Sequence, residues 1–157
     1  MKWILIIILI FVVMLIACSL SEQYKEKFDF YNNLKKFLNE FKINLTFKQD
    51  KILNFLQLTK SKKQFNLFIL SYKNYLKTNK LDLTEIKILD QEEKKQLENI
   101  IKNIGQFDIN NEINQIDLFL IDVEKALKQA EENRNKLCPM ILKLSLLFSI
   151  AVAVLLI

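Results

Sequence analysis

The sequence predicts an all-α protein that carries an apolar segment at each end and a helical domain between them. The chain of 157 residues contains one glycine, Gly105, and one proline, Pro139. All-β folds need far more turn-forming residues than this. In the middle of the chain, apolar side chains recur three or four residues apart, which is typical of one face of a helix. We therefore expect a helical bundle or a set of helical hairpins between the two apolar ends.

The N-terminal segment has the build of a secretory signal. Lys2 precedes fifteen uncharged residues, Trp3–Ala17, and Cys18 follows them. A plain transmembrane anchor needs about 18 to 20 apolar residues, so this run is short for one. An ordinary signal peptidase site would use Ala17 and Ser19 as its small residues. A signal sequence and an uncleaved anchor thus both remain open at this point.

The tetrapeptide Leu15-Ile16-Ala17-Cys18 resembles the lipobox of bacterial lipoproteins. The bias towards Ile, Lys, Asn, Phe and Leu is similar to that of spirochaete lipoproteins. This resemblance implies cleavage between Ala17 and Cys18 and acylation of Cys18, with fatty acids such as palmitate. Residues 1–17 would then be a signal peptide and residues 18–137 an extracytoplasmic, all-helical domain of the bacterial cell envelope, in contact with membrane lipid through Cys18.

The first half of the middle region predicts two helices with an apolar group between them. A helix starting near Ser21 carries an aromatic-rich face that runs from Tyr24 to Leu45, and core packing is the commoner reason for such a face. A second apolar group covers Ile52–Leu58. A third pattern, Phe65–Leu76, predicts a helix that stops near Asn79.

The second half predicts one well-delimited helix after an ambiguous stretch. Leu81–Leu89 partly alternates and is compatible with a short helix capped by Thr84. The helix Gln91–Ile104 has Asp90 as its N-cap and Glu93 three residues later, as in a capping box. Gly105 is placed to close its C-terminal end in the left-handed conformation.

The last helix of the middle region has the strictest period. Its apolar residues step alternately by four and three, which is compatible with a seam for a partner helix. Leu118, Phe119 and Ile121 widen the stripe, so a bundle helix is favoured over a dimeric coiled coil. The seam consists of Ile109, Ile113, Ile116, Leu120, Val123, Leu127 and Ala130.

Residues 138–157 predict a transmembrane helix. Twenty residues at about 1.5 Å each give roughly 30 Å, which is the thickness of the hydrocarbon core. Pro139 suits the first turn of such a helix, or kinks a longer one. Lys143 lies one turn inside and reaches the interface by snorkelling. We take Pro139, Lys143, Leu147 and Ile157 as markers of this anchor.

The distribution and type of the charged residues argue against nucleic-acid binding. The formal net charge is +5, with 13 lysines against 5 acidic residues between Ser19 and Lys80, and an acidic excess from Leu81 to Leu137. Complementary helices in one bundle or a basic face towards anionic lipid are compatible with this division, and helices with solvated charged faces are the commoner explanation. The basic residues are nearly all lysines without a nucleic-acid-binding motif, so nucleic acid is not an expected partner.

The residue types for catalysis and metal binding are sparse. The chain has no histidine, which removes the commonest general base and metal ligand. Cys18 and Cys138 are its two cysteines, and their setting suggests neither a disulfide framework nor a zinc site. No nucleophile–base pair or phosphate loop is recognisable. We expect no catalytic residue, metal, cofactor or small-molecule substrate, and hence no enzyme.

A lipidated cysteine at one end and a membrane span at the other predict a protein of two anchors. The layout is similar to that of unimolecular spanins, which implies a tether between two membranes, with Cys18 in the outer one. The alternatives are a surface lipoprotein that binds a host or envelope protein and an accessory subunit of an envelope complex. In each case a protein partner or a second copy would dock through the helices.

The orientation follows from the N-terminal signal, which places the helical domain outside the cytoplasm. Arg134, Lys136 and Lys143 disagree with this orientation under the positive-inside rule, so a tail-anchored protein with a cytosolic domain stays an alternative.

Overall fold

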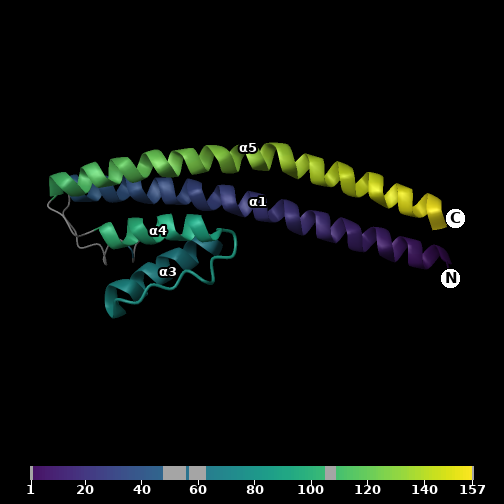
Figure 1. The fold of residues 1–157 in the computed structure, drawn as a ribbon, viewed down its shortest axis with the longest axis horizontal. Helices are drawn as coiled ribbons and strands as arrows, with labels where there is room; N and C mark the ends of the chain where they lie inside the picture. The colour runs from purple at the N-terminus through teal and green to yellow at the C-terminus, as the bar shows by residue number, and fades with distance from the viewer. Residues whose placement is uncertain (1, 48–55, 57–62, 105–108, 157) are drawn as a thin grey trace. The chain divides into compact units, whose positions relative to one another are not determined.

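The computed structural model describes residues 2–47, 56, 63–104 and 109–156, and within them the chain is all-α, as predicted. These residues contain four helices and no strand: α1 (Lys2–Phe47), α3 (Lys63–Thr78), α4 (Gln91–Asn103) and α5 (Ile109–Leu156) (Figure 1). The chain divides into two compact units. We call them the hairpin unit, Met1–Phe28 with Lys128–Ile157, and the helical unit, Asp29–Leu127.

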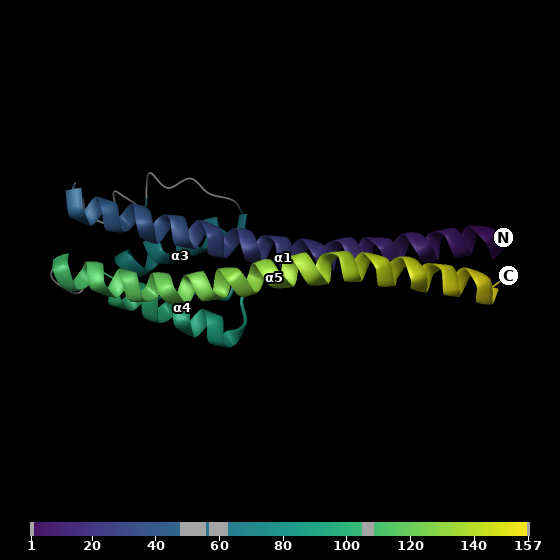
Figure 2. The ribbon, with the colours of Figure 1, turned by 90° about the horizontal axis from the view of Figure 1, so that it is seen from above.

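The hairpin unit consists of the first part of α1 and the last part of α5. These two segments lie side by side and antiparallel, with the N- and C-termini at the same end (Figures 1 and 2). The sequence predicted a new helix near Ser21, but α1 passes through this point without a break. No glycine or proline interrupts the backbone hydrogen bonds there. Pro139 was expected either in the first turn of a separate helix or within a longer one. The structure shows it within a longer helix, α5.

The helical unit has an aromatic core between α1 and α3. The predicted face of α1 is buried from Tyr31 to Phe41, and Phe30 and Phe37 are buried beside it. The ring centroid of Phe68 on α3 lies 6.2 Å from that of Phe30 and 5.9 Å from that of Phe37, both edge-on. Edge-to-face pairs of this kind add to the gain from burial. The same core includes Leu34, Leu38, Phe41, Phe65, Ile69 and Tyr72.

The segment between α3 and α4 is not a helix, so the short helix that the ambiguous stretch Leu81–Leu89 allowed does not form. Asn79 ends α3 at φ 58°, and its N–H donates to the carbonyl of Tyr75 at 2.8 Å. Asparagine tolerates this left-handed conformation. Thr84 caps no helix, because its N–H and hydroxyl both donate to the Asp82 carboxylate, at 2.9 and 2.6 Å. The segment is fixed by three buried side chains: Leu83, Ile86 and Leu89.

The predicted capping box of α4 is confirmed. The Asp90 carboxylate accepts from the N–H of Glu93 at 2.9 Å, and the Glu93 carboxylate accepts from the N–H of Asp90 at 2.9 Å. Two otherwise unpaired donors are thereby satisfied. The predicted role of Gly105 lies outside the described residues, as does most of the apolar group Ile52–Leu58, of which Leu56 is helical and buried.

Two ion pairs join α1 to α5 within the helical unit. Lys35 Nζ lies 2.7 Å from a carboxylate oxygen of Glu124, and Lys42 Nζ lies 2.7 Å from one of Asp117. The two pairs are seven residues apart on each helix, so they repeat at the same register of an antiparallel pair. Exposed pairs of this kind contribute little stability, about 0–1 kcal/mol each. The two pairs therefore show the register of α1 against α5 and add little to its stability.

Candidate functional site: the hairpin unit and the pocket at α4

The surface of the hairpin unit is made of large apolar side chains. Phe11 on α1 is 63% exposed and Leu147 on α5 is 61% exposed. The same holds for a set that covers both segments: Ile7, Ile8, Val12, Leu15, Ile16, Leu144, Phe148, Ile150 and Val154. A soluble protein rarely exposes a contiguous patch of this size. The surface therefore indicates contact with an apolar medium or a partner.

The fully buried side chains between the two segments are small instead. Ala17 is 3% exposed, and Ser21, Cys138, Ser145 and Ser149 are buried with it. The Cys138 Sγ lies 3.4 Å from the carbonyl oxygen of Ser21, to which it donates. Such residues let two backbones approach closely, which drives helix pairing where the surroundings are as apolar as the side chains.

The buried serine hydroxyls that α5 brings to this interface are satisfied within their own helix. Ser145 donates to the carbonyl of Leu142 at 2.9 Å, and Ser149 donates to that of Ser145 at 2.8 Å. Hydroxyls bonded to their own helix suit an environment without water. The interface of the hairpin unit is thus compatible with a bilayer.

Both long helices are apolar enough to span a membrane. The qualifying stretches are Ile7–Thr46 and Ile109–Val154, and only 11% and 17% of their most apolar windows are buried. A helix from the core of a soluble protein would be mostly buried. Small residues inside and large apolar residues outside are the arrangement of a membrane hairpin.

Charged residues gather at the end of the hairpin unit that leads into Asp29 and Leu127. The Arg134 guanidinium lies 4.0 Å from the centroid of the Phe28 ring, a cation–π contact. Lys136 Nζ lies 3.8 Å from a carboxylate oxygen of Glu132, and Lys25 is exposed. This end therefore carries the groups of a membrane–water boundary.

The structure places the predicted anchor and lipidation residues in this unit. Cys18 is exposed on α1, next to the buried Ala17. Pro139 and Lys143 are exposed on α5, as is Leu147, while Ile157 lies outside the described residues. Acylation of Cys18 and cleavage before it stay predictions.

The predicted seam of α5 is partly buried against other helices of the same chain. Ile116 and Val123 are buried in the helical unit, and Ala130 is buried in the hairpin unit. Ile113, Leu120 and Leu127 are half-buried, whereas Ile109 is 43% exposed. Of the residues that widen the stripe, Leu118 and Ile121 are exposed. The use of this seam by a partner helix stays a prediction.

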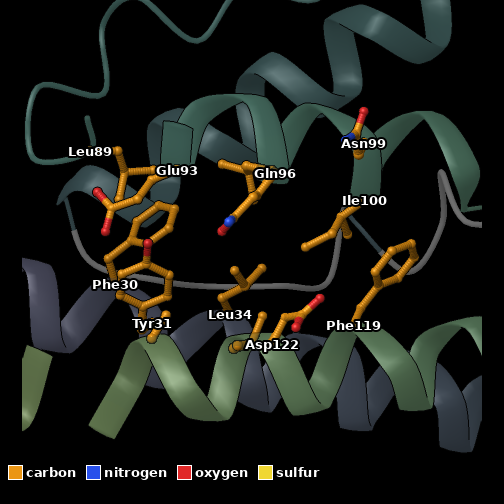
Figure 3. Close-up of a pocket in the computed structure, with 13 residues that line it drawn as sticks. Phe30, Tyr31, Leu34, Leu89, Glu93, Gln96, Asn99, Ile100, Phe119 and Asp122 are labelled. Carbon is orange, nitrogen blue, oxygen red and sulfur yellow. The ribbon is translucent and has the colours of Figure 1, made fainter. Parts of the chain in front are cut away.

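The helical unit contains a partly open cavity of about 150 Å³ beside α4 (Figure 3). Residues of α1, α4 and α5 and the preceding Leu89 line it. Its apolar wall consists of Phe30, Leu34, Leu97, Ile100, Phe119, Val123 and Ala126. The polar side chains around it are those of Tyr31, Glu93, Gln96, Asn99 and Asp122.

Tyr31 connects α1 to α4 at this cavity. Burial raises the pKa of the Tyr31 phenol well above its usual value, and the charge of Glu93 and a hydrogen bond to that side chain raise it further. The phenol therefore acts as a donor to the Glu93 carboxylate. Since Glu93 also closes the capping box of α4, the start of α4 and the edge of the cavity are held by the same side chain.

A second buried tyrosine lies in the aromatic core. Burial, followed by the charge of Glu112, raises the pKa of Tyr72 well above its usual value. Its hydroxyl has no hydrogen-bond partner among the described residues. Glu112 and Asn44 are buried polar residues of the same unit. Within the described ranges no group of three His, Cys, Asp or Glu residues is placed to hold a metal ion.

Residues 2–157 match the family described as stage III sporulation protein AB. The chain belongs to this family. The match begins at residue 2, so it includes the N-terminal apolar segment as well as the C-terminal one. Together with the two apolar helices, it identifies the chain as a membrane-associated protein of sporulation. No curated protein and no solved structure matches the chain.

This family corrects the resemblance to spirochaete lipoproteins and to spanins. The lipobox is only four residues long, and a bias towards Ile, Lys, Asn, Phe and Leu is common to many unrelated proteins, so both signals were too general to identify the family. The structure adds a physical reason against a tether between two membranes. The two apolar segments pack against each other through Ala17, Ser21 and Cys138 within one unit, so they do not reach into separate membranes.

The sequence prediction missed the small-residue interface and the cavity. A signal for the interface was present, because Ala17 and Ser21 are four residues apart, as are Ser145 and Ser149. Small residues at this spacing within apolar runs are typical of paired membrane helices. The cavity had no such signal, since it depends on how three helices meet.

Proposed function

We propose that this chain is a non-enzymatic accessory subunit of a membrane complex that acts during sporulation. The hairpin unit anchors it in one membrane, and the helical unit binds a protein partner. The observation that carries this proposal is the arrangement of the hairpin unit, with small side chains between the helices and large apolar side chains outside. That arrangement suits an anchor and leaves Asp29–Leu127 as the part available to other proteins.

A non-enzymatic role is supported by the side chains around the cavity at α4. They are two carboxylates, two amides and a phenol, and the carboxylate of Glu93 is engaged by Asp90 and Tyr31. No nucleophile with an adjacent base lies among them, as an active site for group transfer would require. Polar groups at the edge of an apolar hollow suit binding instead.

The anchor is proposed to keep its first seventeen residues. Processing at a lipobox would remove residues 1–17 and with them the partner of Ser145 and Ser149 in the hairpin unit. The remaining apolar end of α5 would then lose the small-residue interface at Ala17. An intact α1 preserves the pairing, so we propose that Cys18 lies within an uncleaved helix.

We further propose that the helical unit faces the cytoplasm. The sequence alone predicted the opposite side on the strength of a cleaved signal. In a hairpin, however, the ends of the two apolar segments that lead into the helical unit emerge on the same side of the membrane. Those ends carry Lys25, Lys27, Arg134 and Lys136. Within the described residues, the basic residue at the opposite end is Lys2. Lysines and arginines next to membrane spans remain in the cytoplasm.

Cysteine labelling in living cells tests the anchor and its orientation. Both native cysteines are replaced by serine, and Asn39→Cys in the helical unit is compared with a cysteine added after Ile157. A membrane-impermeant maleimide should label the terminal cysteine in intact protoplasts and Asn39→Cys only after permeabilisation. Reversed labelling would overturn the orientation. Labelling of both positions from the same side, whether in intact protoplasts or only after permeabilisation, would overturn the hairpin itself.

A native gel of the full chain in mild detergent tests the role of the helical unit. The wild type from sporulating cells should migrate well above the size of a monomer. A variant in which residues 29–127 are replaced by a Gly/Ser linker should stay in the membrane fraction, migrate as the anchor alone and fail to support sporulation. Normal sporulation with the linker variant would overturn a partner-binding role for this unit.

A further inference from the structure

We propose that the cavity at α4 receives one lysine or arginine side chain of a protein partner. This inference rests on the proposed function, because it names the chemistry by which the helical unit recognises its partner. It is carried by an apolar hollow with carboxylates and amides at its edge, and by the absence of any basic residue among the side chains that line it.

The size of the cavity suits one long side chain. An apolar cavity of about 150 Å³ is large enough for a benzene-sized group. The methylene stem of a lysine or arginine is of comparable size, and such stems bury well along apolar walls while the charged head stays at the edge. Here the walls are supplied by Leu34 of α1, Leu97 and Ile100 of α4, and Val123 of α5.

The edge of the cavity is acidic. Glu93 comes from the first turn of α4 and Asp122 from α5, so the two carboxylates stand on opposite helices (Figure 3). Gln96 extends from α4 towards Leu34 and brings an amide into the opening (Figure 3). A guanidinium or ammonium group at this edge would donate to carboxylate and amide oxygens. A carboxylate of a partner would be repelled there.

The acidic edge is preorganised by the fold. Glu93 is held by the N–H of Asp90 at 2.9 Å and by the Tyr31 phenol. Asp122 is exposed on α5. One fixed and one accessible carboxylate let a cation bind without reordering α4, which lowers the entropic cost of binding.

Binding of n-butylguanidinium to the full chain in detergent micelles tests the inference. The probe has the stem and head of an arginine side chain, and n-butylurea is its neutral counterpart of similar shape. The methyl signal of Ala126 reports on the cavity in NMR, and that of Ala151 in the hairpin unit reports on probe that merely enters the micelle. We expect saturable binding at Ala126 that is about tenfold tighter for n-butylguanidinium than for n-butylurea.

Four variants separate the contribution of charge from that of space in the cavity. Asp122→Asn and Glu93→Gln each remove one charge, and glutamine still serves in a capping box. Both should weaken n-butylguanidinium binding about tenfold and leave n-butylurea unchanged. Glu98→Gln removes a charge of α4 outside the cavity and should change neither. Ala126→Phe fills the cavity and should abolish binding of both probes.

Equal affinity for the two probes, or an equal loss with Glu98→Gln, would overturn recognition of a cation. No saturable shift at Ala126 would overturn the cavity as a binding site. These outcomes are separable from failure of the proposed function, because the native gel reports complex formation independently. A wild-type complex that survives Asp122→Asn combined with Ala126→Phe would overturn this inference alone, whereas a monomeric wild type would overturn the proposed function.

Discussion

Truncation of Phe68 to alanine removes a ring from the centre of the aromatic core of the helical unit. Phe68 is 1% exposed, and its centroid lies within 6.2 Å of those of Phe30, Phe37, Phe65 and Tyr72. A buried phenylalanine covers roughly 150–250 Å². At about 25 cal/mol per Å², that area corresponds to about 4–6 kcal/mol, of which alanine retains a part. We expect a loss of about 3–5 kcal/mol in the free energy of unfolding.

Urea unfolding of the full chain in mild detergent, followed by far-UV circular dichroism, measures this loss. Leu70→Ala on the same helix is the matched control, because Leu70 is 51% exposed. It should change the free energy of unfolding by at most about 0.5 kcal/mol. Equal, small changes for both variants would refute the packing of α3 against α1 described above.

Three further predictions concern the helical unit. Asp90→Ala removes the cap of α4 and should cost about 1 kcal/mol in the same urea experiment, while Asp90→Ser should recover most of it; no difference between the two would contradict the capping box. Burial raises the pKa of Tyr31 and Tyr72, so both stay protonated in the native state and the protein loses stability as the pH rises above about 10, the unfolded value. In an alkaline titration at 295 nm their phenolate signal should appear together with loss of helix, and its earlier appearance would refute their burial. Lys42→Met should change stability by less than about 1 kcal/mol, since its pair with Asp117 is exposed, and a cost of several kcal/mol in urea would contradict this.

Local signals in the sequence predicted the helices of the middle region well. The apolar period of Phe65–Leu76 and the capping residues Asp90 and Glu93 act within one or two turns, so they can be read without tertiary structure. Leu81–Leu89 stayed ambiguous because the Asp82 side chain accepts hydrogen bonds from the N–H and hydroxyl of Thr84, an alternative to helical bonding that periodicity does not reveal.

The site was predicted less well, because it depends on contacts between distant residues. Ser21 and Cys138 meet across 117 positions of the chain, and the pairing of the two apolar ends rests on such contacts. Each end by itself resembled a separate anchor. The cavity likewise combines Leu34, Glu93 and Asp122 from three helices. The secondary structure of each segment could be predicted, whereas the segments against which it packs could not.

The contact between Ser21 and Cys138 makes it possible to test directly whether both apolar segments form one hairpin in one membrane. With Cys18 replaced by serine, Ser21→Cys is oxidised in isolated membranes and the chain is then cut with trypsin within residues 29–127. We expect the N- and C-terminal fragments to stay joined until a reductant is added, and Glu22→Cys, at an exposed position, to leave them separate. Fragments that separate with Ser21→Cys, or that stay joined equally with Glu22→Cys, would contradict the hairpin.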